Sequence, residues 1–403
     1  MLIEKAKKME QVHYDIRGPI SEEAERMEEQ GIEIVKLHTG NPGLFGFEPP
    51  KYVVEDLMNS LQLSYAYSTS KGLREAREAI VSYSAKKGIT GIEPEDVYTG
   101  NGVSELIMMS MQALLNPGDE VLIPTPDYPL WSAAVTLTGG KVVHYLCDEK
   151  ADWMPDMQDM RRKITSRTKA LVIINPNNPT GALYSNDLLK EMLELARQHN
   201  LLVLSDEIYD RLVMDGLEHT STASLAPDLP MITYNGLSKS HQICGFRCGW
   251  MVLSGDRAQT AGYREGLTVM ASLRLCSNVL SQAVIKSALE DPACSDHLLL
   301  PGGRLYEQRE CAYRMLNAIP GVSAVKPKAA LYIFPKLDRQ KFNLKDDKKL
   351  VLDFLKAKHV LITEGAAYNW TEPDHFRLTY LPKVEELADV INRLGDFLSN
   401  YRQ

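Results

Sequence analysis

The stretch NGLSKSHQICGFRCGW, residues 235–250, contains a single lysine, Lys239, with Arg247 eight positions after it. It continues the apolar run at 231–236, which has the composition of a buried strand. Most lysines are solvated, but the small residues before Lys239 offer its stem no apolar packing. Burial would lower the proton affinity of Lys239 and leave a nucleophilic amine. Arg247 is either a surface charge or a planar fork that binds phosphate through two hydrogen bonds.

The residues before this stretch alternate between strand-like and helix-like patterns. The segment 185–200 has helical spacing, and Ser185 is a candidate N-cap. Buried strands rich in Val, Ile and Leu are predicted at 119–124, 170–175, 201–206 and 231–236. Strands that alternate with helices predict an α/β fold, with a mainly parallel sheet covered by helices on both faces.

The pattern changes after about residue 290, where a smaller α+β domain is predicted. Its expected elements are an amphipathic helix at 302–319, short strands at 329–335 and 375–380, and a last helix at 383–401. We therefore expect an N-terminal arm with part of the small domain at 1–47, a large domain at 48–294 and a small C-terminal domain at 295–403.

The composition argues against several classes of protein. Of the 403 residues 44% are hydrophobic, and the net charge of −8 comes from interspersed signs, so we expect no nucleic-acid partner. No apolar run reaches 18 residues and the N-terminus is charged, so we expect no membrane span and a cytoplasmic location. The six cysteines include no C-x-x-C pair, and we expect no metal site. We assign His241, Cys244 and Cys248 no role beyond packing.

Polar side chains follow five of the predicted strands. Asn101, Asp127, Asn178, Asp206 and Lys239 each lie at or just beyond the end of an apolar run. In a parallel α/β sheet, ligands bind beyond the carboxyl ends of the strands. The coincidence of five strands therefore predicts one site at this edge, more strongly than any single motif does.

Two of these positions have a second interpretation. GNGVSE at 100–105 follows a strand and opens a helix, so its backbone N–H groups suit a phosphate. The same residues form part of a dinucleotide fingerprint, with Glu120 as a candidate ribose ligand, or an ordinary turn with a helix cap at Ser104. Asp206 could cap a following helix instead of serving as a functional carboxylate.

Together these features describe one ligand. They are a phosphate cup at a helix terminus, a buried amine, a carboxylate, an arginine fork and an aromatic side chain, Tyr128. Pyridoxal 5′-phosphate would use all of them, because it combines a phosphate, a basic ring nitrogen and an aldehyde on an aromatic ring. It is therefore the predicted cofactor.

The sequence resembles the class I and II aminotransferases, which are fold-type I pyridoxal-phosphate enzymes. Seven stretches between residues 65 and 380 carry the resemblance: YSTSKGLREAR, GNGVSEL, PDYPLW, NPNNPTG, SDEIYD, NGLSKSHQICGFRCGW and HFRLTY. YDIRGP and YEQRECAYRMLNAIPGV look most like the alanine (glutamate–pyruvate) aminotransferase branch. The resemblance implies a mainly parallel seven-stranded sheet, a smaller α+β domain and a homodimer.

The resemblance also implies roles for residues around the cofactor. Lys239 would carry the cofactor covalently and move the proton between the substrate Cα and the cofactor. Asp206 would keep the ring nitrogen protonated, and Tyr128 would stack on the ring. Asn178 and Tyr209 would form hydrogen bonds with the ring 3-oxygen. The phosphate would be held by Gly102, Val103, Ser104, Ser238, Arg247 and, from the neighbouring subunit, Tyr67.

Substrate binding is implied in the same way. Arg377 would bind the substrate α-carboxylate, with Gly40 and Asn178 in the same pocket. Arg17 and Tyr14 lie on the N-terminal arm, where a mobile arginine could bind the distal carboxylate of glutamate and stay in water when alanine binds. Alternatively, Arg17 only anchors the arm through a surface ion pair.

We therefore predict an aminotransferase that exchanges the amino group between L-alanine and 2-oxoglutarate by a ping-pong mechanism. Aspartate, aromatic or valine-type donors are alternatives. A C–S lyase or a decarboxylase would use the same cofactor but break a different bond. A non-catalytic sensor would need an added DNA-binding domain, which we do not expect, and a nicotinamide dehydrogenase would give Lys239 no function.

Overall fold

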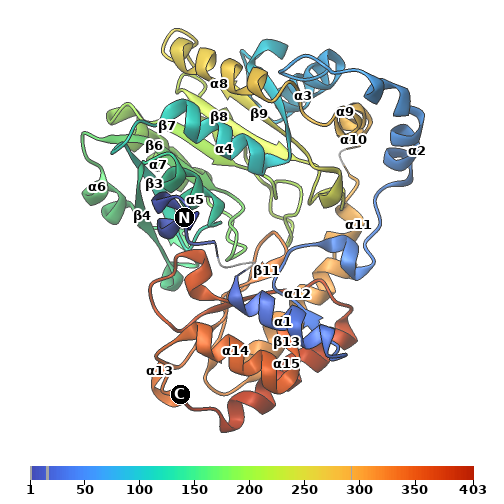
Figure 1. The fold of residues 1–403 in the computed structure, drawn as a ribbon, viewed down its shortest axis with the longest axis vertical. Helices are drawn as coiled ribbons and strands as arrows, with labels where there is room; N and C mark the ends of the chain where they lie inside the picture. The colour runs from blue at the N-terminus through green and yellow to red at the C-terminus, as the bar shows by residue number, and fades with distance from the viewer. Residues whose placement is uncertain (1, 15–17, 292) are drawn as a thin grey trace.

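The computed structural model describes residues 2–14, 18–291 and 293–403. Its centre is an eight-stranded sheet with the order β2-β9-β8-β7-β6-β3-β4-β5 (Figure 1). The strands are β2 (Val97–Asn101), β3 (Glu120–Thr125), β4 (Lys141–Asp148), β5 (Met154–Pro155), β6 (Thr168–Ile174), β7 (Leu202–Asp206), β8 (Met231–Gly236) and β9 (Cys248–Ser254). β4, β3, β6, β7 and β8 pair in parallel, and β9 runs antiparallel between β8 and β2. The predicted α/β fold is confirmed, and the two-residue β5 adds an eighth strand to the seven expected.

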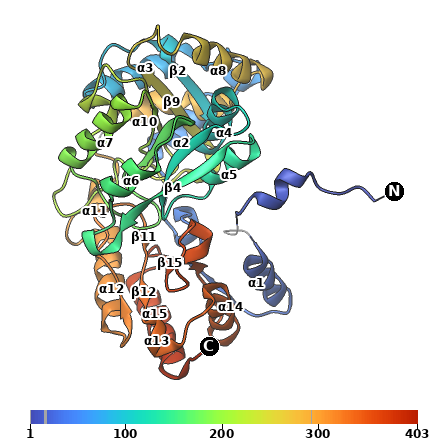
Figure 2. The ribbon, with the colours of Figure 1, turned by 90° about the vertical axis from the view of Figure 1, so that its left-hand side faces the viewer.

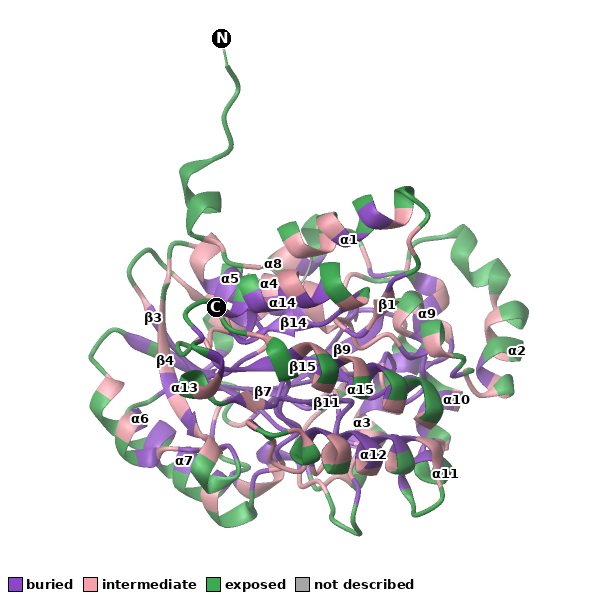
Figure 3. Cartoon of the chain, turned by 90° about the horizontal axis from the view of Figure 1, so that it is seen from below, coloured by how far each residue is buried: buried purple, intermediate pink, exposed green. Residues whose placement is uncertain are grey.

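Side chains that alternate along each strand divide the core into two layers. On β6, Val172 and Ile174 pack with α4 (Val103–Leu114), α5 (Leu130–Leu137) and α8 (Ala261–Leu273). Leu171 and Ile173 pack on the opposite face with α6 (Met157–Lys163) and α7 (Asn186–Gln198). The strands form the buried interior in Figure 3. The continuous apolar runs of the sequence thus reflect strands that are covered on both faces.

Further helices cover the end of the sheet at β2 and β9. They are α2 (Lys51–Asn59), α3 (Arg74–Lys86) and α10 (Ile285–Glu290), which bury Val97, Trp250 and Val252, and α9 (Val279–Ala283), which contacts α2. The N-cap predicted at Ser185 is confirmed at the start of α7. The hydroxyl of Ser185 accepts a hydrogen bond from the backbone N–H of Leu188 at 3.3 Å.

The residues after 295 form a second group of helices and short strands, at the bottom of Figures 1 and 2. The predicted helices are α12 (Arg304–Ala318) and α15 (Val384–Asn400), and a sheet with the order β11-β15-β14 is built from β11 (Tyr332–Ile333), β15 (Phe376–Thr379) and β14 (Thr363–Glu364). The strand predicted at 329–335 is shorter than expected. Ala330 adopts a left-handed φ of 65°, and Pro335 has no backbone N–H to donate.

Smaller elements complete this group, and N-terminal residues join it. Its other elements are α11 (Asp296–Leu299), α13 (Arg339–Phe342), α14 (Asp347–Lys358), β10 (Val322–Ser323), β12 (Lys336–Leu337) and β13 (Val360–Leu361). From the N-terminal side, β1 (Val35–Lys36) pairs in parallel with β13, and α1 (Pro19–Glu29) packs on α14.

The first described residues lie on the outside of the molecule, where residues 7–11 contact α5 and Nζ of Lys8 donates a hydrogen bond to the carbonyl oxygen of Leu137 at 3.4 Å. Residues 2–11, which include the short 3-10 helix η1 (Lys7–Gln11), are exposed and project outward in Figure 2. At Tyr14 the chain approaches the sheet edge, where the hydroxyls of Tyr14 and Tyr128 are 3.3 Å apart. No helix in the described residues combines the length and the apolar composition needed to cross a membrane.

Candidate active site

Six strands, β2, β3, β4, β6, β7 and β8, run in the same direction, so their carboxyl ends open on one edge of the sheet (Figure 1). The antiparallel strand β9 begins at this edge, which explains why Arg247, the residue before it, also lies there. The strands β11 and β15 approach the same edge from the C-terminal group, because Tyr332 and Arg377 contact Tyr209 and Asn178.

Lys239 lies in the turn after β8, and its Nζ donates a 2.6 Å hydrogen bond to the carbonyl oxygen of Gly40. Burial lowers the pKa of the Lys239 amine, but Tyr332 and Cys244 raise it by more, so that the pKa lies above its ordinary value. The expectation that burial would leave a low-pKa amine is therefore wrong for this structure. Neighbouring groups that favour the charged amine outweigh its desolvation.

Asp206 ends β7 and is only 3% exposed. Its two carboxylate oxygens accept hydrogen bonds from the indole N–H of Trp131 at 3.2 Å and from the backbone N–H of Ile208 at 3.3 Å. Burial raises the pKa of Asp206 to about 6, and no lysine or arginine of the described residues offsets that effect. Residues 208–211 form turns, so the helix-cap interpretation is wrong. A buried carboxylate without a counter-charge fits a cationic group, such as a protonated ring nitrogen.

Arg377 lies on β15 and is 2% exposed, and the groups in contact with it are neutral. One terminal nitrogen donates to Oδ1 of Asn178 at 2.9 Å, and the other donates to the carbonyl oxygen of His38. The guanidinium carbon lies 4.1 Å from the ring centre of Tyr332 and 4.6 Å from that of Tyr368. No ion pair joins Arg377 to a carboxylate of the described residues, and its Nε has no hydrogen-bond partner there. This guanidinium therefore fits an anionic ligand such as a carboxylate.

The contact with Arg377 fixes the orientation of the Asn178 amide. A guanidinium can only donate hydrogen bonds, so the amide oxygen must face Arg377 and the amide N–H groups must face elsewhere. The hydroxyl of Tyr209, a second buried donor, lies 2.8 Å from the hydroxyl of Tyr332. The N–H groups of Asn178 and, when Tyr332 donates to it, the O–H of Tyr209 can both serve an anionic oxygen, which fits the 3-oxygen of pyridoxal phosphate.

The segment between β2 and α4 fits a phosphate. Gly102 has a φ of 79° and precedes α4, whose first N–H groups have no side-chain cap. Ser104 lies inside the helix, so the interpretation that it caps the helix is wrong. Nη2 of Arg247 is 2.3 Å from the point where a Cβ on Gly102 would stand. A larger residue than glycine would therefore displace the guanidinium from the helix terminus.

The remaining residues predicted for the site differ in how closely they approach it. Val103 opens α4, and Ser238 is buried one residue before Lys239. Tyr14 reaches the site through Tyr128, while Tyr67 is 78% exposed and forms no hydrogen bond to the described site residues. Arg17 lies outside the described residues.

Glu120 is wrong as a ribose ligand. It begins β3, at the sheet edge opposite the site, and it is buried. Its carboxylate forms ion pairs with Arg167 at 2.7 Å and Lys141 at 3.2 Å, and accepts a hydrogen bond from the hydroxyl of Thr165. The structure therefore removes the acidic residue on which the dinucleotide interpretation depended.

Sequence reasoning missed three aromatic residues of the site: Trp131, Tyr332 and Tyr368. Trp131 stands in the quoted stretch PDYPLW, where a helix begins just beyond β3, so its position gave a usable signal. Tyr332 and Tyr368 come from the C-terminal group. Tyr332 lies on β11, which pairs with β15, and Tyr368 follows β14, the other partner of β15, so both rings lie beside Arg377. No local pattern in the sequence marks them.

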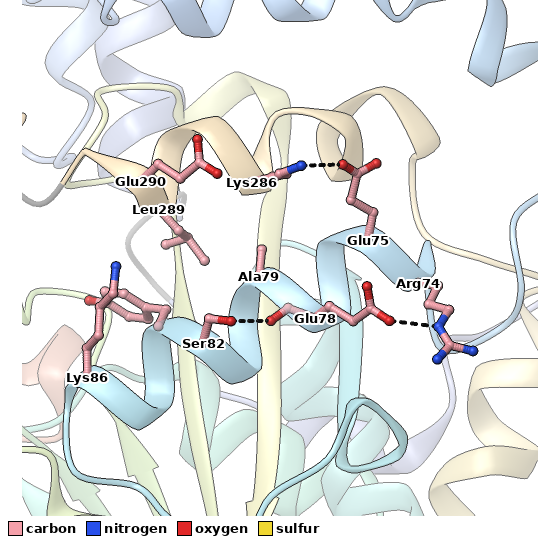
Figure 4. Close-up of a pocket in the computed structure, with 10 residues that line it drawn as sticks. Arg74, Glu75, Glu78, Ala79, Ser82, Lys86, Lys286, Leu289 and Glu290 are labelled. Carbon is pink, nitrogen blue, oxygen red and sulfur yellow. Dashed lines mark hydrogen bonds and ion pairs between the residues drawn. The ribbon is translucent and has the colours of Figure 1, made fainter.

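A second hollow, a groove on the surface, contains none of the predicted site residues. It has a volume of about 600 Å³ and lies between α3 and α10 (Figure 4). Four of its charged side chains pair with one another, Lys286 with Glu75 at 2.8 Å and Arg74 with Glu78 at 2.7 Å. None of the predicted site residues lines the groove, so the sheet edge is the candidate active site.

Comparisons with known proteins agree with this geometry. The family model for aminotransferase class I and II matches residues 32–394. The glutamate-pyruvate aminotransferase AlaA of Escherichia coli (strain K12) is 54% identical over 401 residues, which are 100% of this chain and 99% of that protein. The alanine aminotransferase of Mycobacterium bovis is 50% identical over 98% of this chain and 92% of its own length. The crystal structure of an aminotransferase from Escherichia coli superposes with a TM-score of 0.99 at 54% identity and covers all of both chains. The chain therefore belongs to the class I and II aminotransferases.

Proposed function

We propose that this chain is a pyridoxal-phosphate-dependent aminotransferase that exchanges the amino group between L-alanine and 2-oxoglutarate, giving pyruvate and L-glutamate. The observation that carries the proposal is the pair of buried, uncompensated charges, Asp206 and Arg377, in one site with Lys239. A buried charge without a partner destabilises the folded protein, unless a ligand of opposite charge pairs with it. The names of the relatives at 50% and 54% identity support the choice of substrates.

The cofactor, when bound, supplies an electron sink for the charge left after the substrate Cα proton departs. Asp206 would keep a proton on the ring nitrogen, because its buried carboxylate needs a cationic partner. Asn178 and Tyr209 would donate to the ring oxygen, and Tyr128 would stack on the ring. The phosphate would be bound by the first N–H groups of α4 together with Ser104, Ser238 and Arg247.

The chain itself would bind the substrate and move its proton. Arg377 would bind the α-carboxylate through its guanidinium, which the rings of Tyr332 and Tyr368 hold in place. The Nζ of Lys239 lies beside Gly40 and, in its neutral form, would take the proton from the substrate Cα and return it to the product. In the ping-pong cycle the amino group stays on the enzyme after the first product leaves, so both substrates use the same pocket.

The N-terminal arm is the proposed source of selectivity for glutamate. Tyr14 stands 3.3 Å from Tyr128, so the arm reaches the pocket. Arg17, three residues further on in the sequence, would bind the distal carboxylate of glutamate or 2-oxoglutarate. Alanine would leave that arginine in water at little cost.

The proposal includes a homodimer in which Tyr67 contacts the phosphate bound by the partner. Tyr67 belongs to an exposed apolar surface formed by Leu61, Leu63, Tyr65, Tyr67, Leu273 and Leu275. The two segments of this surface are adjacent, since Arg274 donates a hydrogen bond to the carbonyl oxygen of Ser70. Apolar patches of this kind typically mark protein interfaces. The division at residues 47 and 294 and the cytoplasmic location stay predictions.

Single-turnover spectra test the substrate choice. The purified holoenzyme is mixed with a panel of amino acids, and the absorbance of the bound cofactor is followed. Alanine and glutamate should convert the cofactor fastest, with no ammonia released. Faster conversion by aspartate, aromatic amino acids or valine would contradict the alanine assignment. Pyruvate and ammonia formed without any 2-oxo acid acceptor would indicate a lyase instead.

A further inference from the structure

We infer that Tyr332 is a positioning residue, which directs the hydroxyl proton of Tyr209 toward the cofactor. The inference rests on the proposed function, because it concerns the hydrogen bond that Tyr209 would donate to the ring oxygen of pyridoxal phosphate. It adds a residue from β11, a strand outside the central sheet, to the groups that tune the cofactor.

Tyr332 occupies the middle of the site. It is 2% exposed, and its hydroxyl oxygen lies 2.0 Å from the point where a Cβ on Gly40 would stand. Only glycine at position 40 leaves room for this hydroxyl, and the carbonyl of Gly40 accepts the hydrogen bond of Lys239. The ring of Tyr332 supports the guanidinium of Arg377 on one side, with 4.1 Å from the guanidinium carbon to the ring centre.

The hydroxyls of Tyr332 and Tyr209 form one hydrogen bond of 2.8 Å, with the two rings edge to face at 83°. Each hydroxyl has one proton, so one of the two must donate and the other must accept. Within the described residues, this is the only hydrogen bond of the Tyr209 hydroxyl. If Tyr209 donated to Tyr332, it would have no proton left for the ring oxygen. For Tyr209 to serve the cofactor, Tyr332 must be the donor.

A donor behind Tyr209 has two effects. It fixes the rotation of the Tyr209 hydroxyl, so that its proton points away from Tyr332. It also polarises the O–H bond of Tyr209, because consecutive hydrogen bonds strengthen one another. Asn178 is oriented in a comparable way, since Arg377 engages its oxygen and leaves its N–H groups for another acceptor. Both donors to the ring oxygen are thus set by side chains of the paired strands β11 and β15.

The direction of the expected effect follows from charge. A hydrogen bond from Tyr209 withdraws negative charge from the ring oxygen, which then attracts the proton on the linked nitrogen of Lys239 less strongly. That proton therefore leaves at a lower pH. Removing the Tyr332 hydroxyl should weaken the hydrogen bond and raise the pH at which the absorbance of the bound cofactor changes. The charged and titratable groups that face Tyr209 and Lys239 are Tyr332, Arg377, Asp206, Cys244 and Arg247.

The test is a pH titration of the absorbance of the holoenzyme without substrate. Tyr332→Phe should raise the midpoint by about 0.5–1 pH unit, the value of one ordinary neutral hydrogen bond. The KM for alanine should stay within about twofold, because the ring that supports Arg377 is kept, while kcat should fall by roughly 3–10-fold. Tyr368→Phe is the matched control, since its ring contacts the same guanidinium but its hydroxyl does not bond to Tyr209. Its midpoint should stay at the wild-type value.

A double-mutant cycle makes the test specific. In a Tyr209→Phe background, Tyr332→Phe should cause no further shift, because the hydroxyl it orients is gone. An unshifted or lowered midpoint in Tyr332→Phe, an equal shift in Tyr368→Phe, or an additive shift in the double variant would each overturn the inference. Should Tyr332→Phe fail to fold, Tyr332→Leu also removes the hydroxyl and should raise the midpoint. A wild-type protein that binds no pyridoxal phosphate would overturn the proposed function, whereas a normal wild-type titration with an unshifted variant overturns only this inference.

Discussion

Replacing Asp206 with asparagine should stabilise the cofactor-free protein at pH 8, although it should inactivate the enzyme. Burial raises the pKa of Asp206 from an ordinary value of 3.8 to about 6. One pKa unit corresponds to about 1.36 kcal/mol, so ionised Asp206 costs the folded state about 3 kcal/mol. The side chain is 3% exposed, so solvent screening reduces this value little. Asparagine carries no charge and avoids that cost.

The sign of the pH dependence follows from the raised pKa. Below pH 3.8 the carboxyl of Asp206 is protonated in both the folded and the unfolded chain, so the folded state does not lose stability through burial of a charge. As the pH rises toward about 6, the unfolded chain ionises first and the folded state loses stability, until the loss is complete above that value. Asparagine keeps one acceptor for Trp131 and loses the second, which costs about 1 kcal/mol. The net gain for Asp206→Asn at pH 8 is therefore about 2 kcal/mol.

Urea unfolding of both cofactor-free proteins, at one protein concentration and at pH values from 4 to 8, measures this difference. The difference in unfolding free energy between variant and wild type should change by about 2.4 kcal/mol between pH 4 and pH 8, and mostly below pH 6. A constant difference would show that Asp206 has an ordinary pKa and would refute the argument from burial. In the holoenzyme the wild type should be the more stable protein, because breaking a buried charge pair costs about 3–5 kcal/mol. The same loss in the transition state would lower the rate more than a hundredfold. A loss of activity below tenfold would exclude Asp206 as the partner of the ring nitrogen.

Four further changes test other parts of the site. Lys239→Ala should abolish the borohydride-reducible link between cofactor and protein, and wild-type turnover by this variant would reject the assignment. Mixing Tyr67→Phe chains with Lys239→Ala chains should restore partial activity, because one site of a mixed dimer lacks both changes, and an active monomer in light scattering would exclude the dimer. Gly40→Ala should lower kcat/KM at least tenfold, since its Cβ would lie 2.0 Å from the Tyr332 hydroxyl, and unchanged kinetics would show that the loop adjusts freely. Arg17→Ala should reduce kcat/KM for glutamate by roughly 2–4 kcal/mol and leave alanine nearly unchanged, and equal losses would mean that the arm only closes the site.

Much of the fold and the edge that holds the site could be predicted from sequence because local patterns determine them. The run at 231–236 became β8 with the same bounds, and Ser185 caps α7 as its spacing indicates. Parallel strands place their carboxyl ends together, so residues that follow them, such as Asn178 and Lys239, had to lie near one edge. These predictions needed only the direction of the strands and the periodicity of the side chains.

The parts that could not be predicted depend on contacts between distant segments. Tyr332 and Tyr368 reach Arg377 through the pairing of short strands, whose partners no local pattern reveals. The pKa of Lys239 shows the same limit, because the sequence indicated burial but not that Tyr332 would favour the charged amine. A pKa reflects desolvation, neighbouring charges and hydrogen bonds, and the last two can raise the pKa of a buried lysine. Sequence therefore predicts which residues gather at the site, while the protonation of each one is decided by segments far away in the chain.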